Sequence, residues 1–121
     1  VVGALEGADG VSGYELNVSC PNTRAGGLEF GADPVALTTL IQRARSATAR
    51  PLFVKLSPTL PDVALIAKCA VDAGADGIVL GCTEIGLLVG AQDAVVPLFD
   101  TTALHVETAL DFTLAAESQA A

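Results

Sequence analysis

A cysteine flanked by two asparagines is the first group in this sequence whose residue types and spacing could do chemistry. Cys20 lies three residues after Asn17 and two before Asn22. Carboxamides donate and accept hydrogen bonds, so two of them can hold a planar polar ligand while a thiol moves a proton. The alternative is structural: Cys20 is a small buried side chain, and the asparagines satisfy the backbone of a turn. Residue types alone favour this second interpretation.

A short strand must position this loop. Tyr14, Leu16 and Val18 alternate with polar residues, which predicts an extended segment with two unlike faces. Pro21 lacks a backbone N–H and ends the strand. The loop is therefore expected at the carboxyl end of a strand.

Helices and strands alternate along the rest of the chain. Apolar runs at residues 51–56 and 76–81 are typical of strands buried on both faces, and helices are expected to begin near Pro34 and Pro61. Gly74 should end the second of these helices. A fourth strand is expected after Pro97. A last helix follows it, and its expected inward face consists of Ala103, Val106, Leu110 and Leu114.

The pattern predicts one α/β domain over residues 1–121, with a parallel sheet of about four strands. A complete (β/α)8 barrel needs about 250 residues, so the chain is either half of such a barrel or a flavodoxin-like sheet. Half a barrel has two exposed sheet edges, through which copies of the chain could form a homo-oligomer.

Charged residues in two places need separate explanations. Arg43, Arg45 and Arg50 lie near the end of the first long helix and are expected to face solvent. Lys55 instead interrupts a buried strand, where an unpaired charge is costly, so it must reach a carboxylate, a ligand or solvent.

Composition excludes several classes of function. The net charge of −8 opposes nucleic-acid binding, and no apolar run is long enough to cross a membrane. No secretion signal opens the sequence. The three cysteines, an odd number, suit free thiols in a reducing compartment, so a cytoplasmic location is expected.

Two motifs in the first part of the chain carry a resemblance to a known family. The run ELNVSCPN at residues 15–22 and the run VKLSP at residues 54–58 resemble the signatures of class 1 dihydroorotate dehydrogenases, which are flavin enzymes on a (β/α)8 barrel. The resemblance covers about residues 11–77. It implies that Cys20 takes a proton from dihydroorotate while FMN takes the hydride. It also implies that Asn17 and Asn22 bind the pyrimidine and that Lys55 contacts the flavin ring.

Motifs of a second family follow. The run LGCTEI at residues 80–85, and PLFDTT at residues 97–102 with His105 after it, resemble aspartate/glutamate racemases over about residues 77–117. In that family two thiols face each other across the substrate α-carbon. The resemblance makes Cys82 one of them, with Thr83 and Glu84 beside it, and the opposing thiol belongs to the family's other lobe. The chain is then a chimera of a dehydrogenase-like part, residues 1–77, and a racemase-like part, residues 78–121.

The expected site lies where strands end. Asn17, Cys20, Cys82 and Asp100 all fall at carboxyl ends of strands, the ligand-binding edge of parallel sheets. If the first and third strands flank the second, Cys20 and Cys82 are roughly 10 Å apart.

Three functions remain open from the sequence. The first is a fragment of a dihydroorotate dehydrogenase-like flavin oxidoreductase of pyrimidine biosynthesis, acting on a small acidic substrate. Its activity should be impaired because the chain has no glycine-rich loop for the FMN phosphate. The others are a cofactor-independent aspartate/glutamate racemase-like domain and a non-catalytic scaffold.

Overall fold

Four parallel strands form the centre of the protein. The computed structural model describes residues 1–19, 31–58 and 62–119. The strands are β1 (Tyr14–Asn17), β2 (Leu52–Leu56), β3 (Gly77–Leu80) and β4 (Leu98–Asp100), and they lie in the order β1-β2-β3-β4. A flavodoxin-like sheet would place its first strand inside the order, whereas a barrel adds strands in sequence. The observed order therefore fits half a barrel, with β1 and β4 at the edges.

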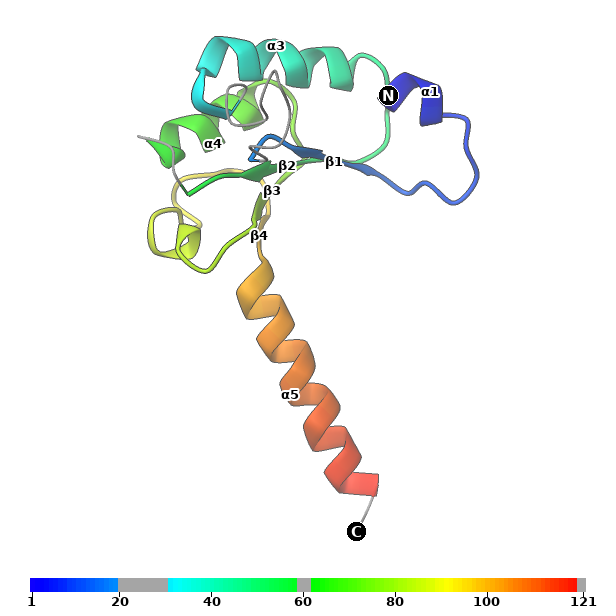
Figure 1. Ribbon diagram of the computed structural model, residues 1–121, viewed down its shortest axis with the longest axis vertical. Helices are drawn as coiled ribbons and strands as arrows, with labels where there is room; N and C mark the ends of the chain where they lie inside the picture. Colours follow the sequence, from blue (N-terminus) through cyan, green and yellow to red (C-terminus); the bar gives the residue numbers. More distant parts are fainter. Residues whose placement is uncertain (20–30, 59–61, 120–121) are drawn as a thin grey trace.

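Two helices cover one face of this sheet. Helix α3 (Pro34–Arg45) and helix α4 (Val63–Asp72) lie on the same side of it (Figure 1). Helix α3 begins at Pro34 as expected, whereas α4 begins at Val63, two residues after Pro61. The side chain of Asp33 accepts a hydrogen bond from the amide of Val35, and that of Asp62 accepts one from the amide of Leu65. The core between helices and sheet consists of fully buried aliphatic side chains, including Leu37, Ile41, Leu52, Val54 and Ile78.

The opposite face of the sheet has no helix over it among the described residues. Side chains alternate along a strand, so Phe53, Val79 and Phe99 point away from α3 and α4. All three are half-buried, and the rings of Phe53 and Phe99 meet edge to face at 5.5 Å between centroids. This surface, called the open face below, is the side that would form the interior of a barrel.

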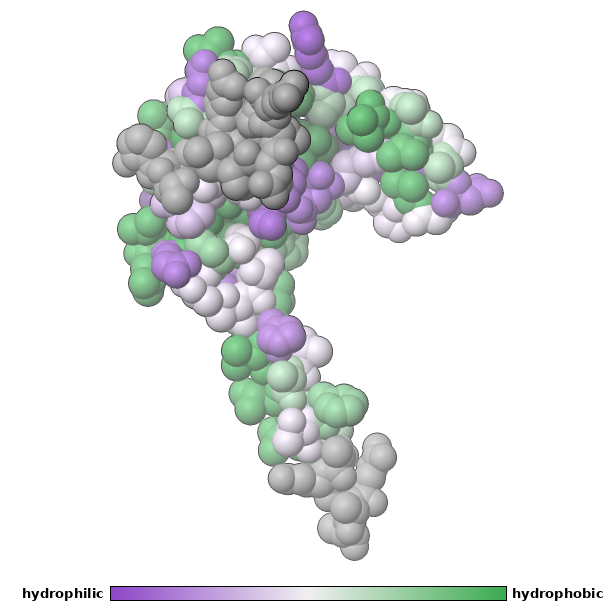
Figure 2. Space-filling model, viewed as in Figure 1, coloured by the Kyte–Doolittle hydropathy of each residue, from purple (hydrophilic) through white to green (hydrophobic). Residues whose placement is uncertain are grey.

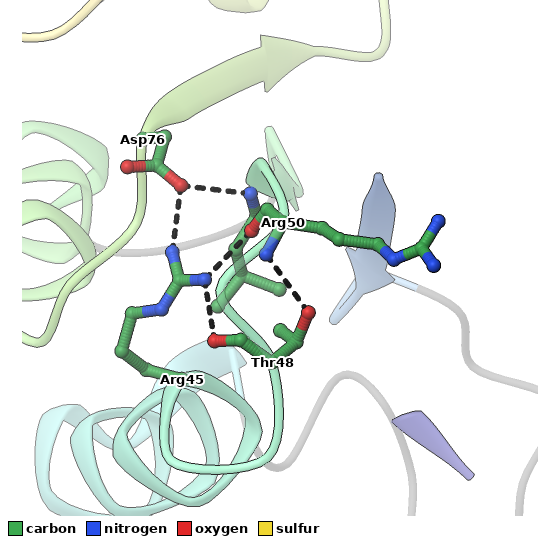
Figure 3. Close-up of polar contacts among 5 residues, drawn as sticks. Arg45, Thr48, Arg50 and Asp76 are labelled. Carbon is green, nitrogen blue, oxygen red and sulfur yellow. Dashed lines mark hydrogen bonds and ion pairs between the residues drawn. The ribbon is translucent and has the colours of Figure 1, made fainter. Parts of the chain in front are cut away.

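Arg45 connects the last turn of α3 to the amino end of the sheet (Figure 3). Its guanidinium donates to the Asp76 carboxylate at 2.7 Å and to the carbonyls of Thr48 and Arg50 at 2.8 and 2.6 Å. The same Asp76 oxygen accepts from the Leu52 amide at 2.9 Å. The expectation that this arginine faces solvent is wrong, because its planar fork satisfies the α3–β2 connection and the start of β3.

Arg50 also has protein partners instead of facing solvent. It donates to the backbone carbonyl of Glu6 at 2.8 Å and lies 3.6 Å from the Glu6 carboxylate, which also accepts from the Tyr14 hydroxyl at 3.0 Å. Hydrogen bonds from Thr48 and Tyr14, with the charge of Arg50, lower the pKa of Glu6. The pKa of Tyr14 is raised, first because burial removes solvent from its hydroxyl and second because the Glu6 carboxylate accepts its hydrogen bond. These contacts hold the segment that follows helix α1 (Val2–Leu5) against the sheet.

Helix α5 (Thr101–Gln119) corrects the expectation of a packed final helix. It projects away from the sheet in Figure 1, and Figure 2 shows apolar residues exposed along it. The expected inward residues Val106, Leu110 and Leu114 are 50%, 56% and 60% exposed. The reason is local: α5 begins at the residue after β4 ends, so no loop turns it back over the sheet. Among the described residues, no helix is long and apolar enough to span a membrane.

Candidate functional site at the carboxyl edge of the sheet

The structure brings Asn17 and Lys55 together at the carboxyl edge of the sheet. Asn17 is the last residue of β1, and its Cα lies opposite that of Lys55 in the parallel register. Both side chains lie on the open face, since the intervening residues Leu16, Val54 and Leu56 point toward the helices. In barrels of parallel strands this edge and this face form the ligand site.

The Asn17 carboxamide is exposed and already ordered by its own loop. Its Oδ1 accepts hydrogen bonds from the amide and the hydroxyl of Ser19, at 3.2 and 2.7 Å. The oxygen is thus engaged, and the carboxamide has two N–H donors besides. Asn17 can therefore offer donors to a ligand carbonyl. Cys20 and Asn22 lie outside the described residues.

Lys55 has no carboxylate within ion-pair distance among the residues that the structure describes. Its Cα lies opposite Val79, but its stem contacts the backbone of Gly81, two residues nearer the carboxyl end of β3. The half-buried side chain thus leans toward the carboxyl edge of the sheet. A cation that is held there without a described counter-ion is suited to an electron-rich ligand.

Gly77, the first residue of β3, and Gly81, the residue after β3, were not expected to shape the site. A Cβ at Gly77 would lie 2.8 Å from Phe99 and 2.9 Å from Phe53, and one at Gly81 would overlap the Lys55 stem. The sequence does contain a signal for this role. Gly77 and Gly81 are four residues apart, so the strand period places both on the same face as Val79.

Cys82, Thr83 and Glu84 form a small cluster after β3. Cys82 is half-buried and packs against the core, while Thr83 and Glu84 are exposed. Hydrogen bonds from the side chains of Cys82 and Thr83 hold the pKa of the Glu84 carboxyl below its usual value. Glu84 also precedes a short 3-10 helix, η1 (Ile85–Leu87). The cluster lies at the same edge as Lys55, which is one strand away, and Asn17, which is two strands away.

Asp100 caps a helix, and His105 lies on the surface of the same helix. The Asp100 carboxylate accepts from the amides of Thr102 and Ala103 at 2.9 and 3.1 Å, which caps α5. His105 is exposed on that helix. Within residues 1–19, 31–58 and 62–119, no group of histidines, cysteines and carboxylates is placed to hold a metal ion.

Known proteins are similar to the part of the chain that contains the carboxyl ends of β1, β2 and β3. The family described as dihydroorotate dehydrogenase matches residues 5–87, which include Cys82 and Glu84. A protein of Aquifex aeolicus described as a dihydroorotate dehydrogenase A (fumarate) is 51% identical over 84 residues. The catalytic subunit of a dihydroorotate dehydrogenase B (NAD(+)) of Citrifermentans bemidjiense is 44% identical over 92 residues.

These matches cover most of this chain but a minor part of each relative. They take in 69% and 76% of the chain, against 28% and 30% of the two relatives. The chain therefore spans less than a third of the length of the curated relatives that it matches. The matched region contains β1 with its loop, β2 with Lys55, β3 and both covering helices. On this evidence the chain belongs to the dihydroorotate dehydrogenase family.

Proposed function

We propose that this chain provides one part of a flavin-dependent site for oxidising dihydroorotate, the part with the proton-abstracting thiol. The observation that carries the proposal is the placement of Lys55. It is opposite Asn17, with its stem directed to the carboxyl edge and no described counter-ion. FMN, when bound, would accept the hydride.

The described residues fit a flat aromatic cofactor. Lys55 supplies a cation for electron-rich ring atoms, and Asn17 supplies amide donors for a carbonyl of the substrate. Next to them Phe53, Val79 and Phe99 line an apolar hollow of about 190 Å³ on the open face. A charged group bordering an apolar surface suits a ring system with both polar and apolar edges.

The proton step is assigned to Cys20, with Asn17 and Asn22 holding the pyrimidine. Only the thiolate is basic enough to remove a carbon-bound proton, and an unperturbed thiol ionises near pH 8.5. The S–H bond would form as the C–H bond of dihydroorotate breaks. The reaction should therefore accelerate as the pH rises through the thiol pKa, and this dependence should disappear in Cys20→Ser.

Titration of the purified chain with FMN, followed by quenching of flavin fluorescence, tests the binding part of this proposal. Saturable binding is expected, and Lys55→Ala should raise Kd about tenfold because a charge-assisted contact is lost. The matched control is Lys68→Ala, since Lys68 is exposed on α4 and pairs with Asp72 at 3.1 Å. Absence of saturable binding, or equal affinities of the two variants, would contradict the proposal.

A second candidate is racemase-like chemistry at Cys82, in a chimeric chain whose part after residue 77 derives from a racemase. The contact among Cys82, Thr83 and Glu84 favours it. In this candidate the Cys82 thiol would return a proton to the substrate carbon. Removal of the α-proton would then belong to an opposing thiol, for which Cys20 is the candidate on this chain.

Exchange in heavy water tests this second candidate. NMR should show deuterium replacing the α-proton of aspartate when the wild-type chain is present. Cys82→Ser should abolish the exchange, whereas Cys69→Ser should not, because Cys69 packs against the core from α4. If the wild-type chain catalyses no exchange above the buffer rate, the racemase candidate is rejected.

A further inference from the structure

On the open face, β3 and the residue after it carry few side chains. The residues on that side are Gly77, Val79 and Gly81, so a side chain is present at only one of three positions. The larger side chains of the neighbouring strands use the space: the rings of Phe53 and Phe99 lie beside Gly77, and the stem of Lys55 lies against Gly81. The missing side chains at Gly77 and Gly81 thus leave room for side chains of β2 and β4.

At Gly81 the contact involves most of the lysine stem. A Cβ there would lie 3.0 Å from Cγ and 3.1 Å from Cδ of Lys55 and would overlap Cε. Real Cβ atoms essentially never approach so closely, so the stem would have to move. The nearby backbone is that of β3 itself, which leaves the flexible lysine as the group that yields.

We infer that Gly81 is a positioning residue for Lys55: its missing Cβ lets the lysine stem cross β3 and hold the ammonium at the carboxyl edge. The ligand part of this inference rests on the proposed flavin site, whereas the positioning part does not. Gly81 itself offers no group to a ligand beyond its backbone. Its role would be exerted entirely through Lys55.

Backbone conformation does not explain the glycine. Among the described residues, positive φ angles occur at Gly10 and Gly74, and Gly81 is not one of them. Alanine can therefore adopt the conformation at position 81 without strain. Gly81→Ala tests the contact with Lys55, not the freedom of the main chain.

The experiment measures where Lys55 lies in the absence of FMN. The protein is labelled with a limiting amount of an amine-reactive reagent. Mass spectrometry then gives the modification rate of Lys55 relative to that of Lys68. Gly81→Ala should raise this ratio severalfold because the half-buried stem moves toward solvent. The matched control is Gly7→Ala, where a Cβ meets nothing within 4 Å. An unchanged ratio in a folded Gly81→Ala protein would overturn the inference.

The FMN titration supplies a second, separable result. Gly81→Ala should raise Kd about tenfold in the wild-type background but have no further effect in Lys55→Ala, because both changes act on one contact. A general structural defect would weaken binding in both backgrounds and would overturn the inference. If the wild-type chain binds no FMN, the proposed function fails, while the labelling ratio still decides the role of Gly81.

Folding of the variant has its own control. If Gly81→Ala does not fold, the double variant with Lys55→Ala should restore the circular dichroism spectrum, since the shorter side chain removes the overlap. A double variant that also fails to fold would show that the Lys55 contact is not the reason for glycine at position 81.

Discussion

Replacing Arg45 with alanine is expected to lower the free energy of unfolding by about 2–3 kcal/mol. The guanidinium makes three hydrogen bonds, to Asp76 and to the carbonyls of Thr48 and Arg50, and the aliphatic stem of the side chain lies against Gly74. The side chain is 27% exposed, so water replaces only part of what is lost. Urea unfolding followed by circular dichroism measures the change.

Arg43→Ala is the matched control. It lies in the same last turn of α3 but is exposed, and its replacement should change stability by less than about 0.5 kcal/mol. Equal losses in the two variants would contradict the assigned role of Arg45. A double-mutant cycle with Asp76→Ala should give a coupling energy of about 1 kcal/mol, since Asp76 also accepts from the Leu52 amide and keeps part of its function alone.

Local features of the fold could be predicted from the sequence. Helix α3 begins at Pro34 as expected, and Gly74, with φ of 107°, follows α4 in the conformation expected of a C-terminal cap. Such features depend on a few adjacent residues. A parallel sheet of four strands was expected as well, whereas the sequence left the strand order open between half a barrel and a flavodoxin-like sheet.

Features that depend on distant parts of the chain were not predictable in the same way. Arg45 and Asp76 are 31 residues apart, and nothing near Arg45 in the sequence indicates its partner. The direction of α5 is set by the missing loop after β4, whereas its apolar spacing alone suggested a packed face. For the site, the edge position of Asn17, Cys82 and Asp100 followed from strand ends, whereas the pairing of Asn17 with Lys55 and the space at Gly81 depend on neighbouring strands.

Val54→Ala is expected to lower the free energy of unfolding by about 2–3 kcal/mol, and Val79→Ala by less than about 1 kcal/mol. The two variants delete the same atoms from adjacent strands. Val54 is fully buried between β2 and the helices, whereas Val79 is half-buried on the open face. Denaturant unfolding at low protein concentration should show the difference, and equal losses would mean that both faces of the sheet are equally covered.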